Sequence, residues 1–429
     1  MSVQQLLTPP ATMPQPLAAC YALACLLMPV VSLFNARALV PIAAVAALSA
    51  LIVVWRRREL AVLVSTDRWL LALIAAYIVA QTAASLGGPA IGDSMRSVAK
   101  FTGIAVMLLT FTSLQSLLDG DDRKWIFLTL LASVAAALAM ILFDVFFGGM
   151  LSELVHGYDM QSDHIRNQLG HYGYFWYKSA SSFLGVAVLV LGIYAHKHAG
   201  ALPALVLVAL GALAAHQIDS RTAAFGVILA LAAGALYHFL GRYRLRLLIA
   251  AMGFAFLLPV WISASGISPS DISDGLSKKV SAAHSIVYRL HIWDFTTDKI
   301  MEKPVLGWGA GASKRVGTDA KGAVTDPKFG NLGEPIPVHP HNAVLQIWLE
   351  FGLVGAVTVF LLIARALTLA DRLAAAPGTR IWTFSVVALL VCFFGFNFSI
   401  SSSWWLASVA VFIALASIFA RNSGTPASP

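Results

Sequence analysis

Residues 180–196, ASSFLGVAVLVLGIYAH, and residues 202–219, LPALVLVALGALAAHQID, are two long apolar stretches joined by a short connection. A spanning helix needs roughly 20 mostly apolar residues to cross a bilayer core about 30 Å thick. Each stretch therefore predicts one transmembrane helix. The same criterion, applied along the whole sequence, predicts twelve helices, at residues 17–35, 38–55, 69–85, 100–118, 125–146, 180–196, 202–219, 223–240, 246–263, 342–368, 380–398 and 404–420.

The composition of the whole chain points to the same class of protein. Of its 429 residues, 59% are hydrophobic and 12% are charged, and the mean hydropathy is +0.78. Soluble domains carry about 25% charged residues, so a cytosolic enzyme, a secreted domain and a disordered chain are excluded. Cys20, Cys25 and Cys392 lie within apolar runs, so neither a disulfide framework nor a metal cluster is expected. We therefore expect an all-α, polytopic integral membrane protein.

Basic residues in alternate short loops predict the orientation of the chain. They include Arg56–Arg58, Arg123 with Lys124, and Arg242 with Arg244. Lys and Arg accumulate on the cytoplasmic side of membrane proteins, so both termini are expected to be cytoplasmic. The net charge of +8 has a second interpretation, a basic site for an anionic ligand. The first 16 residues lack a basic region, so no cleavable signal peptide is expected.

Two outward segments are too long to be simple turns, because loops beyond about 12–15 residues are usually functional or disordered. Residues 264–340 contain enough apolar and aromatic residues to predict a folded, partly helical lid. This gives three parts: residues 1–263 with nine helices, the lid at 264–340, and residues 341–429 with three helices and a cytoplasmic tail. The other outward segment, 147–179, predicts either part of a substrate cleft or an aromatic belt at the membrane interface. Its candidate residues are His164, Arg166, His171, Tyr172, Tyr174, Trp176 and Lys178.

Arg221 and Arg289 are candidates for binding an anion on the outward side. Arg221 lies in Asp219-Ser220-Arg221-Thr222, between two apolar helices, and Arg289 lies in the lid between Tyr288 and Trp293. A guanidinium group can bind a phosphate through two parallel hydrogen bonds. The alternative for Arg221 is a helix-end anchor that extends to the membrane interface.

Glycines and histidines mark the end of the lid. Gly307, Gly309 and Gly311 either let backbone N–H groups approach a phosphate or shape a turn. His339 and His341, at the entrance to the tenth helix, suggest either a general base or a hydrogen-bonded helix cap. Two histidines without nearby Cys or carboxylate ligands make a poor zinc pattern, so we expect no metal site.

Several of these motifs occur in the order seen in O-antigen ligases and their relatives. They are Ser220-Arg221-Thr222-Ala223, Arg289 with Trp293, Pro304 with Gly307, Gly309 and Gly311, and His341-Asn342 followed after nine residues by Gly352-x-x-Gly355. The motifs cover about residues 215–360, and the rest of the chain is similar only in hydropathy and helix number. The sequence thus resembles the superfamily of O-antigen ligases, O-antigen polymerases and O-linked oligosaccharyltransferases.

The resemblance implies a GT-C-like membrane glycosyltransferase, most closely an O-antigen ligase. Such an enzyme transfers polysaccharide from undecaprenyl pyrophosphate to a sugar hydroxyl of lipid A–core, on the periplasmic face of the inner membrane. The transfer would be single-step and inverting, with no cofactor, no metal and no nucleic-acid partner. Arg221 and Arg289 would stabilise the leaving pyrophosphate, and His341, with His339 as the alternative, would be the general base. Further substrate-binding residues are expected at Ser220, Tyr288, Trp293, Asn342, Arg166 and Lys178.

Two kinds of protein compete with this interpretation. Within the superfamily, a polymerase would join repeat units to one another instead of attaching the polymer to lipid A–core. A transporter or flippase would place paired charges near the middle of the membrane. Asp144 is the chief charged candidate inside a predicted helix, and it is expected near the outer end of that helix. The cationic and histidine residues gather at one membrane face instead, which favours chemistry at the interface.

Overall fold

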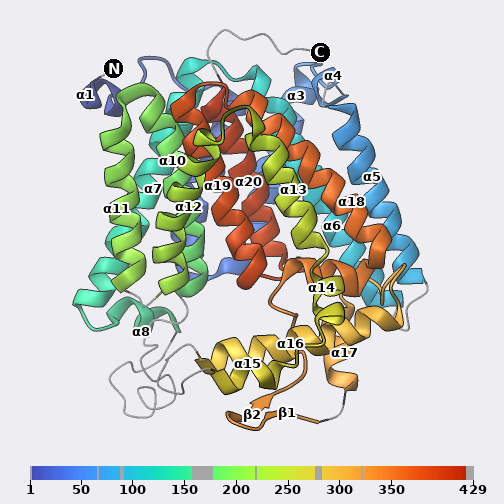
Figure 1. Cartoon of the computed structure of the whole chain (residues 1–429). Coiled ribbons are helices and arrows are strands. Elements are labelled where there is room, and N and C mark those ends of the chain that lie inside the picture. The colour runs from blue at the N-terminus through green and yellow to red at the C-terminus, as the bar shows by residue number, and fades with distance from the viewer. Residues whose placement is uncertain are drawn as a thin grey trace.

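A computed structural model describes residues 2–64, 67–86, 91–156, 177–217, 220–275, 283–320 and 322–421; of residues 64, 156, 221 and 222 it describes the backbone only. Twelve helices run side by side as a bundle (Figure 1). They are α2 (Pro16–Phe34), α3 (Leu39–Arg56), α5 (Arg68–Leu86), α6 (Ile91–Leu114), α7 (Gly120–Phe146), α10 (Tyr177–Ala199), α11 (Ala201–Gln217), α12 (Arg221–Phe239), α13 (Arg244–Phe256), α18 (Ala343–Leu373), α19 (Pro377–Phe396) and α20 (Ser403–Ala420).

Each of the twelve predicted spans overlaps one of these helices, but not all of the helices are independently long and apolar enough to cross a membrane. Within the described ranges, nine helices meet both conditions alone, or ten spans if one bent pair is counted. The bent pair joins Ala223–Phe239 to Gly241–Phe256 at 109°, and α11 is a shorter apolar helix. The chain is therefore an all-α polytopic membrane protein, with a count of clear spans below the twelve expected.

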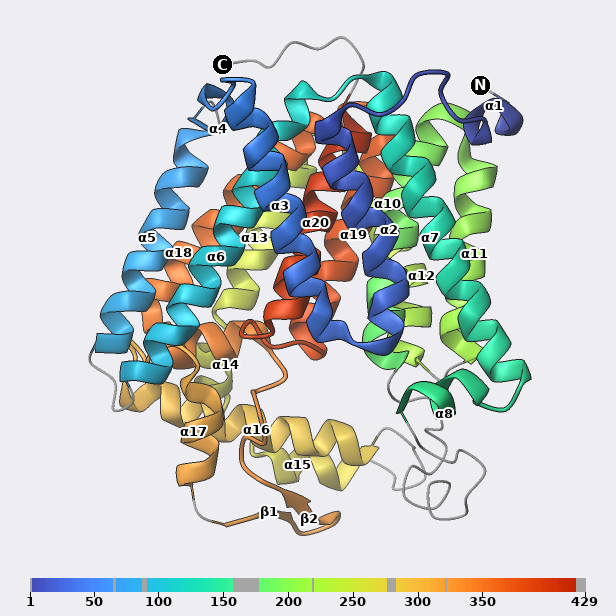
Figure 2. The ribbon, with the colours of Figure 1, turned by 180° about the vertical axis from the view of Figure 1, so that it is seen from behind.

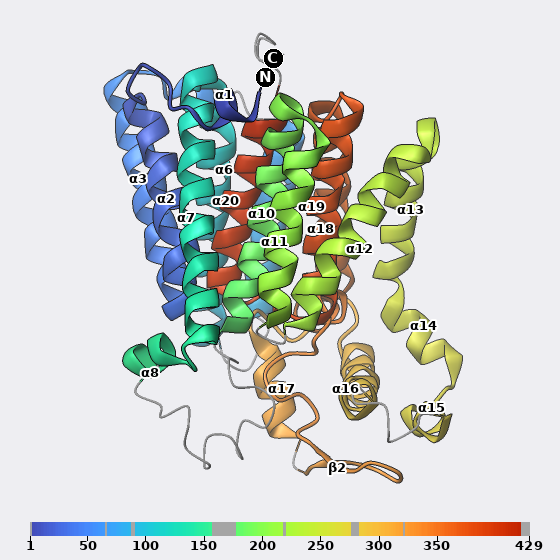
Figure 3. The same cartoon turned by 90° about the vertical axis from the view of Figure 1, so that its left-hand side faces the viewer.

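The predicted helix at 246–263 is in fact two helices. α13 ends at Phe256, and α14 (Leu258–Ser265) begins with a proline in its first turn, Pro259. Proline lacks the N–H that an uninterrupted helix needs and is well placed in a first helical turn. α14 therefore leaves the bundle and leads into the lid (Figure 3).

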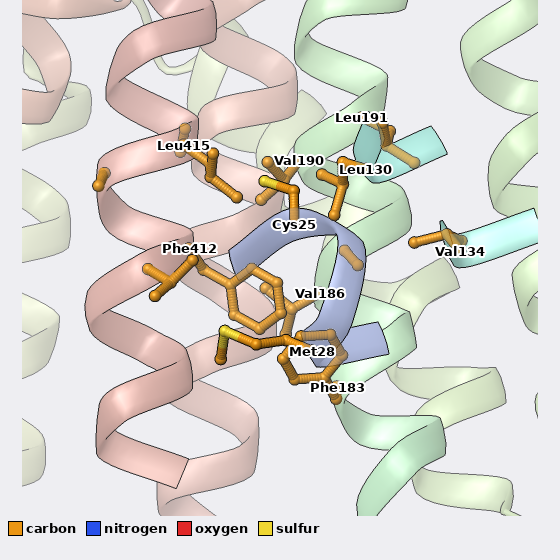
Figure 4. Packing of buried hydrophobic residues seen from close by; sticks show 14 of the residues in the cluster. Cys25, Met28, Leu130, Val134, Phe183, Val186, Val190, Leu191, Phe412 and Leu415 are labelled. Carbon is orange, nitrogen blue, oxygen red and sulfur yellow. The ribbon is translucent and has the colours of Figure 1, made fainter. Parts of the chain in front are cut away.

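α10 is the central helix of the main core, and 89% of its apolar window is buried. Its residues 180–195 have other helices on every side, which explains why this stretch is apolar throughout rather than on one face. Figure 4 shows Phe183, Val186 and Val190 of α10 packed against α2, α7 and α20. The partners at this point are Cys25 and Met28 of α2, Leu130 and Val134 of α7, and Phe412 and Leu415 of α20.

The lid lies at one end of the bundle, and the N- and C-terminal parts lie at the other (Figures 1 and 2). Its elements are α15 (Pro269–Gly275), α16 (Ala283–Glu302), α17 (Ala312–Asp319) and a small antiparallel pair of strands, β1 (Val324–Asp326) and β2 (Gly330–Gly333). We call this the lid end. Short helices α1 (Val3–Leu7) and α4 (Ala61–Val64) lie at the opposite end.

Asp144 lies in the last turn of α7, at the lid end, and is fully buried. Its Oδ1 accepts hydrogen bonds from the N–H groups of Leu151 and Ser152, at 2.6 and 3.2 Å. Its Oδ2 accepts from the hydroxyl groups of Ser152 and of Tyr177, the latter at 2.8 Å. This carboxylate thus joins α7 to α8 (Met150–His156) and to the start of α10, which is a structural task rather than one expected of a transport site.

Candidate active site

The loop Val338-His339-Pro340-His341-Asn342 leads from the lid into α18. Asn342 is the N-cap of α18, and its side-chain oxygen accepts hydrogen bonds from the N–H groups of Val344 (2.9 Å) and Leu345 (3.1 Å). These donors would otherwise be unpaired in the first turn of the helix. The side-chain oxygen of Asn342, expected to bind substrate, is therefore engaged in fixing the helix directly after His341.

The imidazole rings of His341 and His339 differ in their hydrogen bonding. The backbone N–H of His341 donates to Nδ1 of His339 at 3.1 Å, and the two ring centroids lie 4.3 Å apart. His341 adopts a left-handed conformation with φ of +53°, which a non-glycine residue rarely adopts. His339 therefore holds the loop shape, and a neutral His339 ring carries its proton on Nε2. Nδ1 of His341 is buried and makes no hydrogen bond within the described residues.

The surroundings keep both imidazoles neutral. Burial, then His341 and Arg289, lowers the pKa of His339 to about 4. Burial and the Arg289 guanidinium also lower the pKa of His341 from its ordinary value of 6.5. Near neutral pH, His341 is thus an uncharged ring, able to accept a proton, next to a fixed cation.

Arg289 lies on α16 and is half-buried. Burial lowers the pKa of its guanidinium, which stays charged at any physiological pH because arginine starts so high. Among the described residues it makes no hydrogen bond or ion pair. A partly buried, unpaired guanidinium group next to two neutral histidines is a strong attractor for an anion.

Tyr288 and Trp293 position α16 against this loop. The indole N–H of Trp293 donates to the carbonyl of Pro340, between the two histidines, at 3.0 Å. The hydroxyl of Tyr288 donates to the carbonyl of Glu334 at 2.8 Å. Both residues were expected to bind substrate, but their polar atoms bond to the backbone of the lid. They fix the position of Arg289, which lies between them in the sequence, relative to His341.

A second contact fixes the outer part of the lid. Nε2 of His291 on α16 lies 3.0 Å from Oδ2 of Asp326 in β1. Burial alone would raise the pKa of Asp326, but hydrogen bonds from His291, the N–H groups of Phe329 and Lys328, and Ser273 lower it to about 2. The strand pair is thereby attached to the helix that carries Arg289.

The glycine-rich stretch 304–311 packs on a break in α18. The helix is interrupted at Gly352, whose φ of 60° and ψ of −156° are not helical. The carbonyls of Leu349 and Glu350 accept from the N–H groups of Trp308 and Gly309, both at 2.9 Å. Likewise, the N–H groups of residues 353 and 354 donate to the carbonyls of residues 304 and 305, at 2.8 and 3.2 Å. In an unbroken helix these four groups of α18 would pair with one another.

The same stretch has no free cradle of N–H groups for a phosphate. The N–H of Gly307 donates to the Lys303 carbonyl, that of Ala310 to Ser85 Oγ (3.2 Å), and that of Gly311 to Glu350 Oε2 (2.8 Å). With those of Trp308 and Gly309, five consecutive donors are engaged within the protein. Of the two interpretations of these glycines, the structure supports the turn and not the phosphate loop.

Residues predicted around Arg221 are described only in part. Ser220 is buried at the N-cap of α12, and its Oγ accepts a hydrogen bond from the Ser181 hydroxyl at 2.6 Å. Arg221 is the first residue of α12, at the lid end, but its side chain lies outside the described atoms. Lys178 is exposed in the first turn of α10. Arg166, with His164, His171, Tyr172, Tyr174 and Trp176, lies outside the described residues.

The sequence interpretation missed three polar residues near this end of the bundle. Glu350 and Gln346 on α18 are buried, with exposed fractions of 0% and 1%, and Lys100 lies within α6. Charged residues inside apolar helices are rare and usually functional or paired, and this signal was available for Glu350 and Lys100. Glu350 lies between the His341-Asn342 and Gly352-x-x-Gly355 motifs, and Lys100 is the first residue of the predicted helix at 100–118.

No group of three or more His, Cys, Asp or Glu side chains in the described part of the chain is arranged to hold a metal ion. Within the described ranges, the candidate site consists of a neutral histidine, an arginine that has no hydrogen-bond or ion-pair partner there, and the helix starts that present them. This set can bind an anionic group and accept a proton beside it.

Comparison with known proteins covers the segment that carries these residues. Residues 204–360 match the family model described as O-Antigen ligase. A protein named "Putative polysaccharide ligase" from Rickettsia conorii is 33% identical over 161 residues, which are 36% of this chain and 36% of that protein. A protein of the same name from Rickettsia typhi is 34% identical over 154 residues, 34% of this chain and 35% of that protein. The match thus spans about a third of these curated relatives. Residues 204–360, which include Arg221, Arg289, His339 and His341, are therefore similar to the O-antigen ligase family.

Proposed function

We propose that the protein transfers an O-antigen polysaccharide from undecaprenyl pyrophosphate to a sugar hydroxyl of lipid A–core, at the periplasmic face of the inner membrane. The observation that carries this proposal is the guanidinium of Arg289, which pairs with no described residue, beside the neutral imidazole of His341. The guanidinium suits the pyrophosphate of a lipid-linked donor, and the imidazole suits the hydroxyl of an acceptor. Both lie within the segment that matches the family.

The arginines act on the leaving group. When the bond between the anomeric carbon and the pyrophosphate oxygen breaks, the oxygen keeps the electron pair and its negative charge grows. A guanidinium placed against that oxygen binds the transition state more tightly than the intact donor. Arg289 provides one such group, and Arg221, at the start of α12, is proposed as the second. The half-buried setting of Arg289 strengthens the effect, because charges interact more strongly away from water.

His341 acts on the acceptor. A sugar hydroxyl is a weak nucleophile, and removal of its proton during attack makes the transfer faster. The new bond joins the hydroxyl oxygen to the anomeric carbon, the bond to pyrophosphate breaks, and the proton moves to His341. One displacement of this kind inverts the configuration at the anomeric carbon. His339 is the weaker candidate, because its Nδ1 already accepts the backbone N–H of His341.

The experiment that tests this function is reconstituted transfer. Purified protein in nanodiscs is mixed with undecaprenyl-pyrophosphate-linked polysaccharide and lipid A–core, and the product is separated by size. Attachment of long polymer to lipid A–core supports the proposal. Lengthening of the lipid-linked polymer without attachment would show a polymerase instead, and no reaction of either kind would overturn the proposal.

A further inference from the structure

A cavity of about 280 Å³ opens beside the candidate site. It lies between α6, α17, α18 and the connection from α19 to α20. Val338, directly before the His339–Asn342 segment, and Gln346, four residues after it, both line the cavity. No residue of α16, the helix that carries Arg289, contributes to its wall. The cavity is therefore next to the proposed base but on a different set of helices from the proposed pyrophosphate site.

Two lysines line this cavity. Lys100 lies nine residues after the start of α6, or roughly 13 Å along the helix axis. Lys314 extends from the first turn of α17. In the described part of the chain, neither ammonium group makes a hydrogen bond or an ion pair. An ammonium group within a membrane-spanning helix is costly unless it faces a polar space or a ligand.

The one carboxylate on the wall, Glu350, already accepts three hydrogen bonds within the protein. Oε1 of Glu350 accepts from the Ser313 hydroxyl at 2.6 Å and from the Gln346 amide at 2.9 Å. Oε2 accepts from the N–H of Gly311 at 2.8 Å. Glu350 thus holds α17, α18 and the glycine-rich stretch together, and it is not placed to pair with either lysine.

The remaining wall offers groups suited to a polyol. Ser97, Ser401 and Ser403 line the cavity and present hydroxyl groups. The side-chain oxygen of Gln346 accepts from the Ser399 hydroxyl at 3.0 Å and from the Ile400 N–H at 3.1 Å, which fixes this connection in place. Ser402, the N-cap of α20, makes no side-chain capping bond, so the first N–H groups of α20 add partial positive charge at the same wall.

We propose that this cavity binds an anionic sugar of the acceptor glycolipid, one that carries a phosphate or a carboxylate. The two ammonium groups would bind the anionic substituent, and the serine hydroxyls would bind the sugar ring. The inference rests on the proposed function, because His341 must lie near an acceptor hydroxyl. The pyrophosphate of the donor is anionic too, but the proposed function already assigns it to Arg289 on α16.

The test measures binding of each substrate separately in nanodiscs. The variants are Lys100→Gln, Lys314→Gln and the double variant, with Lys299→Gln as control. Lys299 has the same charge but pairs with Glu302 on α16 at 2.6 Å and does not line the cavity. The probes are purified lipid A–core and undecaprenyl pyrophosphate.

We expect each cavity variant to weaken lipid A–core binding about tenfold, with donor binding unchanged and the control like the unmodified protein. Arginine at either position should restore most of the affinity. Glucose 6-phosphate should compete with lipid A–core better than glucose does. Weakened donor binding with intact acceptor binding would assign the cavity to the donor and overturn the inference, as would unchanged binding of both.

The outcomes also separate this inference from the function on which it rests. If the unmodified protein transfers polysaccharide but the folded double variant binds lipid A–core normally, only the cavity assignment fails. If the unmodified protein transfers nothing but binds lipid A–core in a lysine-dependent way, the proposed reaction fails and the anionic-sugar site stands. Thermal unfolding of each variant verifies that the protein remains folded.

Discussion

Gly307 and Gly352 face each other across the contact between the lid and α18. A Cβ atom on Gly307 would lie 2.5 Å from the carbonyl carbon of Glu350, and one on Gly352 would lie 2.4 Å from the carbonyl carbon of Val305. Both residues have positive φ, 71° and 60°. Each glycine therefore permits a close approach by the backbone of the two residues before the other glycine, and four backbone hydrogen bonds join the two segments.

Alanine at either glycine should destabilise the protein. Gly352 occupies a region of backbone space that is almost exclusive to glycine, so Gly352→Ala should cost at least about 1–3 kcal/mol in strain alone. Gly307→Ala should cause a similar loss of stability. The losses from the two substitutions should not add in a double variant, because both disturb the same contact. The measurement is thermal unfolding in detergent. Gly103→Ala is the control, since a Cβ there meets no atom within 4 Å; equal melting temperatures for all three would contradict the packing role.

Replacement of the two histidines should have unequal effects on transfer. His341→Ala should abolish transfer while donor binding remains, because the proton acceptor is lost. His339→Ala should be milder and should act through the loop, since His339 accepts the His341 N–H. Because the pKa of His341 is lowered, activity should fall only below pH 6.5. The opposite ranking would move the base to His339, and an active double variant would eliminate histidine catalysis.

Arg221 and Arg289 should both be needed for donor binding and transfer. Alanine at either position should reduce transfer by at least about a hundredfold, as for other groups that stabilise developing charge. Lysine should restore little, because a point charge lacks the two parallel donors of a guanidinium group. Arg246→Ala, on α13, is a control for loss of one positive charge. Full transfer by either lysine variant would count against the pyrophosphate clamp.

Acid should destabilise the protein through His339. Its folded pKa of about 4 lies below the ordinary 6.5, so the unfolded chain binds a proton that the folded protein does not. The contribution of His339 to the free energy of unfolding is complete above pH 6.5 and is lost as the pH falls toward 4. The total loss is on the order of 3 kcal/mol. Melting temperatures of the unmodified protein and of His339→Gln at pH 7.5 and pH 5 provide the measurement. The variant should lose less stability over this interval; an identical loss would refute the assignment.

Transfer should survive exhaustive removal of divalent cations. The proposed mechanism places the leaving group against arginines and the acceptor proton on His341, so no step requires a Lewis acid. The measurement is the transfer rate after treatment with excess chelator and after addition of single cations. A loss of activity that one cation restores would contradict this prediction and would make His339 and His341 candidate metal ligands.

Much of the fold could be predicted because hydropathy reports directly on the length of an apolar helix. All twelve predicted stretches contain a helix, and residues 180–195 of the central stretch are buried on all sides. The break before Pro259 could have been anticipated from proline chemistry. The bend between α12 and α13 was not predictable in this way, because hydropathy contains no information on the angle between consecutive helices.

The site could be predicted only as a set of residues, not as an arrangement. Motif spacing selected Arg289 and His341, but proximity between them depends on Trp293, whose indole bonds to Pro340. Spacing also cannot separate a side chain that binds substrate from one that holds the backbone, which is why Asn342 was expected to do the first and is seen to do the second. The role of Glu350 was hidden because its partners, Gly311 and Ser313, are nearly forty residues away in the sequence.

The helix break at Gly352 also has a consequence for how the protein is made. Residues 304–309 precede residues 349–354 in the chain, so the lid segment is synthesised before its contact on α18. In an unbroken helix the four backbone groups of α18 pair with one another, and in the folded protein they pair with the lid. α18 can therefore enter the membrane as a continuous helix with its backbone satisfied, and the break forms when the lid docks and exchanges those hydrogen bonds for its own.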